Sequence, residues 1–182
     1  QVYYVVSMKE KFSLLTHLLK KKDDEGLALV FCSTRREADS VNKNLRMQNI
    51  RAMVIHGGLT QKKRGIALDA LKNEKINVLV ATDVAARGLD IKNITYVYNY
   101  DVPKTSEEYI HRIGRTARAG SEGDAVTLLA ERDYDNFNRV LSDRKITIKK
   151  EEVPKFERVF FKREQQQYER RGNFRKSSQY ER

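Results

Sequence analysis

INVLVATDVAARGLD (residues 76–90) is the segment that most clearly indicates the fold of this chain. Its first half, INVLVAT (76–82), is a mostly apolar run without the alternation of polar and apolar residues. Such a run is typical of a strand that is buried on both faces of a parallel sheet, because a strand with one solvated face alternates polar and apolar residues. Polar side chains begin where the run ends, and parallel sheets bind their ligands beyond the carboxyl ends of the strands. The stretch therefore predicts a buried parallel sheet and a functional edge.

Similar apolar runs recur along the chain, and segments with helical periodicity separate them. Besides 76–82, strands are predicted at 2–6, 27–32, 51–56, 94–100, 124–130 and 146–150. Helices are predicted at 8–22, 34–48, 61–72, 106–115 and 134–143. Thr34, with Glu37 three residues later, predicts a capping box, and Thr60 opens the next helix. The alternation predicts an α/β fold in which helices cover both faces of a parallel sheet.

Composition and charge narrow the classes of function. The 182 residues suit about one domain. Lys and Arg number 36 against 25 Asp and Glu, a net charge of +11, which favours a polyanionic partner such as nucleic acid or, more simply, keeps the protein in solution. The single cysteine, Cys32, excludes an intrachain disulfide and a thiolate zinc site, and no metal site is predicted.

Neither a membrane span nor a targeting segment is expected. No apolar run approaches the ~20 residues that cross a bilayer, and the first residues lack the order of a signal peptide. With one cysteine, the expected location is intracellular, in the cytoplasm or a nucleus, and no membrane partner is predicted.

The composition changes near residue 150, so the predicted division is a domain at 1–150 and a basic tail at 151–182, partly or wholly disordered. Aromatic residues alternate with Arg and Lys in this tail, which suits stacking on unpaired bases together with phosphate contacts. The alternative is a solvated tail whose first aromatic residues, within 153–161, dock on the domain.

The second half of the opening stretch, ATDVAARGLD (81–90), places a hydroxyl, a carboxylate and a guanidinium at a strand end. Its small residues leave room for a ligand to approach the backbone. Asp90 could accept hydrogen bonds from the vicinal hydroxyls of a sugar. The simpler alternative is a helix-capping Asp83 and an ordinary surface Arg87.

The segment HRIGRTARAG (111–120) spaces Arg112, Arg115 and Arg118 by three. On a helix or tight turn these side chains form one stripe, and three guanidinium groups repel one another unless anions neutralise them. The anions are either protein carboxylates or phosphate, whose oxygens match the guanidinium fork. A guanidinium that contacts a transferring γ-phosphate accelerates the reaction ~10³–10⁵-fold.

The segment HGGLTQKKR (56–64) follows a predicted strand and opens a helix. Gly57 and Gly58 are expected to expose backbone amides, and a helix N-terminus binds anions. Gln61 and Arg64 lie one turn apart on the same face. The segment therefore suits a nucleic-acid phosphate, the alternative being a glycine turn before a solvated basic helix.

Two parts of a nucleotide-hydrolysing site are missing from the sequence. There is no GxxxxGK[ST] phosphate-binding loop, and no acidic pair follows a strand in a position to hold magnesium. An arginine stripe without these parts implies that another lobe supplies them.

Four segments in the order FCST (31–34), HGGLTQKKR, ATDVAARGLD and HRIGRTARAG closely resemble the C-terminal RecA-like lobe of DEAD-box ATP-dependent RNA helicases. YDVPKTSEEYIHR (100–112) also resembles the family, and the likeness covers about 1–150. One departure is Gly58, where the family usually has Asp. The resemblance implies a RecA-like sheet and a chain that completes its site with an N-terminal lobe.

The resemblance also implies roles by position. Catalysis, through contact with the γ-phosphate across the cleft, falls to Arg115 and Arg118. ATP binding falls to the same two arginines and to Asp90 near the ribose. Coupling between the lobes falls to His111, Arg112 and Arg87. Binding of the RNA backbone, independent of base sequence, falls to Thr34, Gly57, Gln61, Arg64 and Thr82.

ATP and Mg²⁺ are the implied cofactors, with Mg²⁺ held mainly by the N-terminal lobe, and the isolated chain is expected to be inactive. Two other readings stay open. One is an RNA-binding module that has lost catalysis, and the other is a helicase-like lobe that acts on DNA.

Overall fold

The computed structural model describes residues 1–21, 26–87, 89, 91, 94–116 and 123–162. The strands are β1 (Val2–Val5), β2 (Leu27–Phe31), β3 (Ala52–Ile55), β4 (Val78–Ala81), β5 (Ile94–Asn99), β6 (Asp124–Leu129) and β7 (Lys149–Lys150). The helices are α1 (Lys11–Lys21), α2 (Arg35–Met47), α3 (Gln61–Lys72), α4 (Asp83–Ala86), α5 (Ser106–Ile113) and α6 (Tyr134–Leu141), with a 3₁₀ turn η1 (Glu131–Asp133) before α6.

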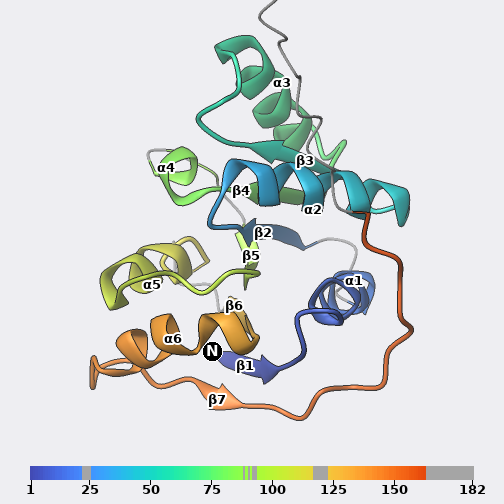
Figure 1. The fold of residues 1–182 in the computed structure, drawn as a ribbon. Helices are drawn as coiled ribbons and strands as arrows, with labels where there is room; N and C mark the ends of the chain where they lie inside the picture. The colour runs from blue at the N-terminus through green and yellow to red at the C-terminus, as the bar shows by residue number, and fades with distance from the viewer. Residues whose placement is uncertain (22–25, 88, 90, 92–93, 117–122, 163–182) are drawn as a thin grey trace, which may run out of the picture.

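Within the described residues, the strands form one seven-stranded sheet in the order β3-β4-β2-β5-β6-β1-β7. Every neighbouring pair runs parallel, as the continuous apolar runs predicted. Figure 1 shows the helices arranged around this sheet. Because all strands point the same way, their carboxyl ends meet at a single edge, and the loops that follow β2, β3, β4 and β5 lie there together.

The alternation of side chains along β2 shows how both faces of the sheet are covered. Ala28 and Val30 join the core beneath α1 and α2, whereas Leu29 and Phe31 face the opposite side and pack with residues of α3 and α4. On that second side, α5 and α6 cover β1 and β6 in a further apolar cluster. The predicted α/β fold with helices on both faces is therefore confirmed.

The predicted helix starts are also confirmed. Thr34 and Thr60 are the N-caps of α2 and α3, and their hydroxyl oxygens accept the backbone N–H of Glu37 at 3.1 Å and of Lys63 at 3.3 Å. An N-cap of this kind contributes about 1 kcal/mol because it satisfies an otherwise unpaired amide.

Most element boundaries differ from the prediction by one or more residues; helix α1, for example, begins at Lys11 rather than at residue 8. Helix α5 ends at Ile113 and Gly114 caps it, two residues before the predicted end, since glycine is a poor helix former. Helix α4 has only four residues, too few to show a periodicity in the sequence. Strand β7 covers Lys149–Lys150 rather than 146–150.

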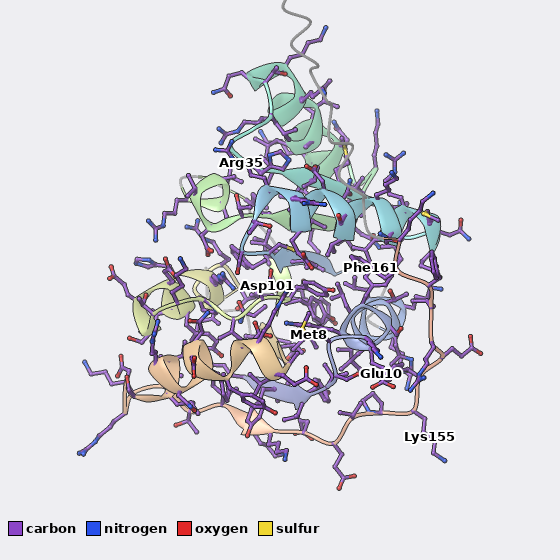
Figure 2. The ribbon with its side chains drawn as sticks, in the orientation of Figure 1. Met8, Glu10, Arg35, Asp101, Lys155 and Phe161 are labelled. Atoms are coloured by element: carbon purple, nitrogen blue, oxygen red, sulfur yellow. The ribbon has the colours of Figure 1, made fainter. Side chains whose placement is uncertain are left out.

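Residues 151–162 run as an extended strap across α1 and α2. Phe156, Val159 and Phe161 are partly buried against the core on that side, and the rings of Phe12 and Phe161 lie 4.8 Å apart. Asn44 fixes the end of the strap through two hydrogen bonds with the backbone of Lys162, at 2.7 and 3.0 Å. The strap thus lies against the domain, as the docking alternative expects, and Figure 2 labels Phe161 beside α1.

RNA contact by the tail stays a prediction, and residues 163–182 lie outside the described part of the chain. Among the described helices, none combines the length and the apolar character that crossing a membrane requires.

Candidate functional site

Arg112 is the centre of the site and, at 2% exposure, is buried. Its Nε and Nη2 donate to the two carboxylate oxygens of Asp83 at 2.6 and 2.8 Å. Its Nη1 donates to Asn99 Oδ1 at 3.0 Å and to the Asp101 carbonyl at 2.6 Å. The guanidinium plane lies 4.8 Å from the ring centroid of Phe31. A fork-to-fork pair with this many partners fixes the side chain in one position.

This arrangement answers the question of which anion neutralises Arg112. Its partner is a protein carboxylate, Asp83, so Arg112 points into the lobe and does not share an exposed stripe with Arg115. Asp83 therefore pairs with Arg112, and the cap of α4 is Thr82. The part that Arg112 plays in coupling between lobes stays a prediction, and it would act through Asp83.

A shallow hollow, open to solvent, lies beside this pair. Its lining comes from the end of β2, from α4 and the residue after it, and from α5 and the turn after it: Phe31, Asp83, Ala86, Arg87, Glu108, His111, Arg112 and Arg115. The structure thus brings together the predicted catalytic residue Arg115 and all three residues predicted to couple the lobes. The lining holds three arginines (Arg87, Arg112 and Arg115) against two carboxylates (Asp83 and Glu108), so its formal charge is positive and suits an anionic group.

The exposed side chains around the hollow are placed by short local elements. His111 lies exposed on α5. Arg115 follows the end of that helix, is half-buried, and donates from Nη1 to the Leu89 carbonyl at 3.3 Å. Arg87 ends α4 and lies 3.9 Å from Glu108. A pair this exposed contributes little to stability, so Arg87 can change partners at low cost.

The residues predicted to bind RNA lie along the same sheet edge, after β2, β3 and β4. Thr34 and Gln61 are exposed at the starts of α2 and α3, and Arg64 is half-buried one turn into α3. Thr82 is buried, and its side chain makes no capping hydrogen bond. Because β3, β4 and β2 are adjacent in the sheet, these loops form one continuous border. Their contact with RNA stays a prediction.

The turn after β3 differs in one respect from the expectation that both glycine amides are exposed. The amide of Gly58 donates to His56 Nδ1 at 3.1 Å, and the amide of Leu59 donates to the His56 carbonyl. His56 Nε2 lies 3.0 Å from Asp39 Oδ1, so the ring carries its proton on Nε2 and accepts with Nδ1. The Gly58 amide is thus already occupied.

Arg35, which the sequence analysis did not select, lies over this turn. A Cβ added at Gly57 would come within 3.3 Å of the Arg35 guanidinium, and one added at Gly58 within 3.5 Å of its Cδ. The two glycines therefore allow the arginine to lie against the backbone. Figure 2 shows Arg35 near the gap between α3 and α4. The sequence signal that could have identified Arg35 is its position directly after Thr34, a residue predicted to bind RNA.

Asp101 and Asn99 are the other residues that sequence reasoning missed. Both are buried at the end of β5. Asp101 belongs to YDVPKTSEEYIHR, a segment recognised as similar to the family but given no site role. The signal was a carboxylate directly after a buried strand. Two predicted residues, Asp90 and Arg118, lie outside the described residues.

Cys32 lies at the same edge but is not a reactive group. Its thiol is fully buried. Burial, and next the negative charges of Asp101 and Glu37, raise the pKa of the Cys32 thiol well above its usual value. The thiol therefore stays protonated and packs as a small apolar side chain.

Comparisons with known proteins show the family of this chain. The family described as helicase conserved C-terminal domain matches residues 10–120. The ATP-dependent RNA helicase CshA of Listeria monocytogenes is 46% identical over 160 residues, which cover 88% of this chain and 31% of that protein. The chain thus spans about a third of the length of this curated relative.

Two solved structures share the fold. A DEAD box protein from the hyperthermophile Methanococcus jannaschii has a TM-score of 0.75 and 39% identity, covering 82% of this chain and 41% of that one. Dbp5 of S. cerevisiae, bound to RNA and ADP BeF3, has a TM-score of 0.73 and 28% identity, covering 84% of this chain and 41% of that one. The chain belongs to the helicase conserved C-terminal domain family and has the RecA-like fold of the C-terminal lobe of DEAD-box proteins.

Proposed function

We propose that this chain is the C-terminal lobe of an ATP-dependent RNA helicase. Together with an N-terminal RecA-like lobe it binds ATP and single-stranded RNA, hydrolyses ATP and unwinds or remodels RNA duplexes. The observation that carries the proposal is the hollow in which Arg115, Arg87 and His111 surround the Arg112–Asp83 pair.

The geometry of the hollow supports a role in phosphoryl transfer. Arg115 lines the open surface of the hollow, which leaves its guanidinium accessible to a phosphate. On closure with the N-terminal lobe, the guanidinium of Arg115 stabilises the charge that develops on the transferring phosphoryl group. Asp90 near the ribose and Arg118 at the phosphate belong to the same proposal.

RNA binding is proposed along the border of the sheet that carries Thr34, Gly57, Gln61, Arg64 and Thr82. Hydroxyl, amide and guanidinium groups there suit the sugar-phosphate backbone, which makes binding independent of base sequence. The similar Dbp5 structure contains that protein bound to RNA, which supports RNA as the partner here.

Mg²⁺ belongs to the proposal for the two-lobe enzyme rather than to this chain alone. Among the described residues, no three His, Cys, Asp or Glu side chains gather closely enough to hold a metal ion. The residues seen here therefore do not fit Mg²⁺ by themselves, and we propose that the N-terminal lobe holds it. The single, buried Cys32 supports the further proposal of an intracellular location.

ATP turnover of the two-lobe protein with single-stranded RNA tests the proposal. We expect Arg115→Ala to lower turnover at least ~10³-fold while the protein stays folded. Arg139→Ala, which removes an exposed arginine of α6, is the matched control and should not change turnover.

Three results would overturn parts of the proposal. Unchanged turnover in Arg115→Ala would remove the catalytic role of that residue. Sustained turnover by this chain alone would remove the two-lobe mechanism. Equal stimulation by single-stranded DNA of the same base sequence would favour the alternative in which the lobe acts on DNA.

A further inference from the structure

Four charged residues lie together at the carboxyl edge of the sheet, and the proposed function does not use them. Lys11 is fully buried, and its Nζ lies 2.5 Å from Asp133 Oδ2 and 3.8 Å from Asp101 Oδ1. Arg132 contacts Asp101 at 2.5 Å from the solvent side. Buried charges are costly to desolvate, so a cluster of this size calls for a reason beyond packing.

We propose that Asp101 is a positioning residue that couples the loop at Ser33 and Thr34, on the proposed RNA border, to the arginine segment at Arg112 and Arg115. This inference rests on the proposed function. It states how RNA binding and phosphoryl transfer, the two parts of that function, are linked within one lobe. Asp101 lies near the middle of the molecule in Figure 2.

The side chain of Asp101 holds the first of these loops. Its Oδ2 accepts the backbone N–H of Ser33 at 2.8 Å, and Ser33 directly precedes the N-cap Thr34. A carboxylate that accepts a backbone N–H makes a charge-assisted hydrogen bond, roughly twice as strong as a neutral one. Asp101 therefore sets where α2 begins and where the hydroxyl of Thr34 stands.

The backbone of the same residue holds the arginine segment. The Asp101 carbonyl accepts Nη1 of Arg112 at 2.6 Å, and the other face of that guanidinium holds Asp83. Arg115 follows three residues later and donates to Leu89. One residue thus contacts the RNA-side loop through its side chain and the phosphate-side segment through its main chain.

The surrounding charges keep Asp101 in place. Arg132 pairs with Asp101 Oδ1. Burial disfavours the charge of Arg132, but Asp101 and Glu37 outweigh this effect and raise the pKa of its guanidinium. Lys11 is held by Asp133, whose Oδ2 also accepts the Ala130 amide at 3.2 Å. Asp101 itself is only 3% exposed, so its carboxylate cannot turn to water, and a shift of Arg112 moves Ser33 with it.

The test in the two-lobe protein is Asp101→Asn, which keeps the shape and removes the charge. We expect the RNA concentration that half-saturates ATP turnover to rise about fivefold or more, with the half-saturating ATP concentration at high RNA unchanged. The matched control is Asp143→Asn, because Asp143 Oδ1 likewise accepts a backbone N–H, that of Lys145 at 3.0 Å, away from the site. A purely structural role predicts less active protein with both half-saturating concentrations unchanged, and that result would overturn the proposal.

A second measurement uses this chain alone and does not depend on catalysis. Arg112 makes no direct hydrogen bond with Ser33 among the described residues. Asp101 joins the two through hydrogen bonds, whereas Phe31, two residues before Ser33, contacts Arg112 through its ring alone. We expect Arg112→Lys to speed hydrogen exchange of the Ser33 amide more than that of the Val30 amide in β2. Equal changes at both amides would overturn the coupling. If the wild-type two-lobe protein shows no RNA-dependent ATP turnover, the proposed function fails. The exchange measurement still tests whether Asp101 links Arg112 to Ser33.

Discussion

Arg112 and Asp83 form a two-point ion pair across the carboxyl edge of the sheet, with N–O distances of 2.6 and 2.8 Å. The pair joins α5 to the start of α4, so it connects the two polar segments that follow β4 and β5. Arg112 therefore belongs to the support of the site, whereas Arg115, three residues later, belongs to its open surface.

This difference predicts unequal effects on stability. Arg112→Ala leaves Asp83 and the Asn99 amide oxygen without their donor, and removing one partner of a buried ion pair costs about 3 kcal/mol or more. Arg115→Ala should cost less, about 1 kcal/mol, because Arg115 is only half-buried at the open hollow, where a truncation costs less than in the buried pair. Urea unfolding of this chain measures both, and equal losses would contradict the assignment of Arg112 as a support.

An aspartate in place of Gly58 is predicted to put a negative charge beside Arg35. A Cβ at this position would lie 3.1 Å from His56 Nδ1 and 3.5 Å from Arg35 Cδ, so Gly58→Asp places an anion next to that arginine. We expect weaker binding of single-stranded RNA. The slope of log binding constant against log salt concentration should become shallower by roughly 0.7, which corresponds to the loss of one phosphate contact. Gly58→Ala is the control, because it adds the same Cβ without charge. Equal weakening in both variants would show a steric cause instead.

The strap is predicted to stabilise the domain through one face only. Phe161 packs on Phe12, whereas its neighbour Phe160 is 76% exposed. Phe161→Ala should lower the unfolding free energy by about 1–2 kcal/mol, since part of a ring is buried, and Phe160→Ala should change it by less than about 0.5 kcal/mol. Urea unfolding of the two variants measures these changes. If residues after 150 do not contribute to the stability of the domain, Phe161→Ala and Phe160→Ala should have the same unfolding free energy.

His17 is predicted to make stability fall in mild acid. Burial, and next the charge of Lys21, lower the pKa of the His17 imidazole, and its Nε2 is buried without a hydrogen-bond partner among the described atoms. The unfolded chain therefore binds this proton first as the pH falls through about 6.5, and the folded state loses stability there. His17→Gln should remove this contribution, so the unfolding free energy of the wild type should fall relative to that of the variant between pH 7.5 and 5.5. Curves that stay parallel would refute the prediction.

The elements that the sequence predicted well are those with a strong local cause. The run at 76–82 contains β4 because its centre, VLVA at 78–81, is wholly apolar, and Thr34 starts α2 because its hydroxyl can accept an amide three residues on. The same local reasoning misses α4, whose four residues are shorter than a helical repeat. It also cannot tell where the Arg112 side chain points. The spacing by three would place Arg112 and Arg115 on one face of a helix, but the helix ends at Ile113, before Arg115.

By itself, the sequence determined the parallel α/β fold, the sheet edge that carries the site and most of the residues found there, because hydrophobic periodicity and short motifs are local properties of the chain. Only the tertiary structure decided which partner neutralises Arg112, that the strap packs on α1 and α2, and that Asp101 stands between the two halves of the site. These contacts join residues far apart in the chain, as Ser33 and Asp101 are. The strand order brings them together, and the low dielectric of the buried edge gives their hydrogen bonds weight.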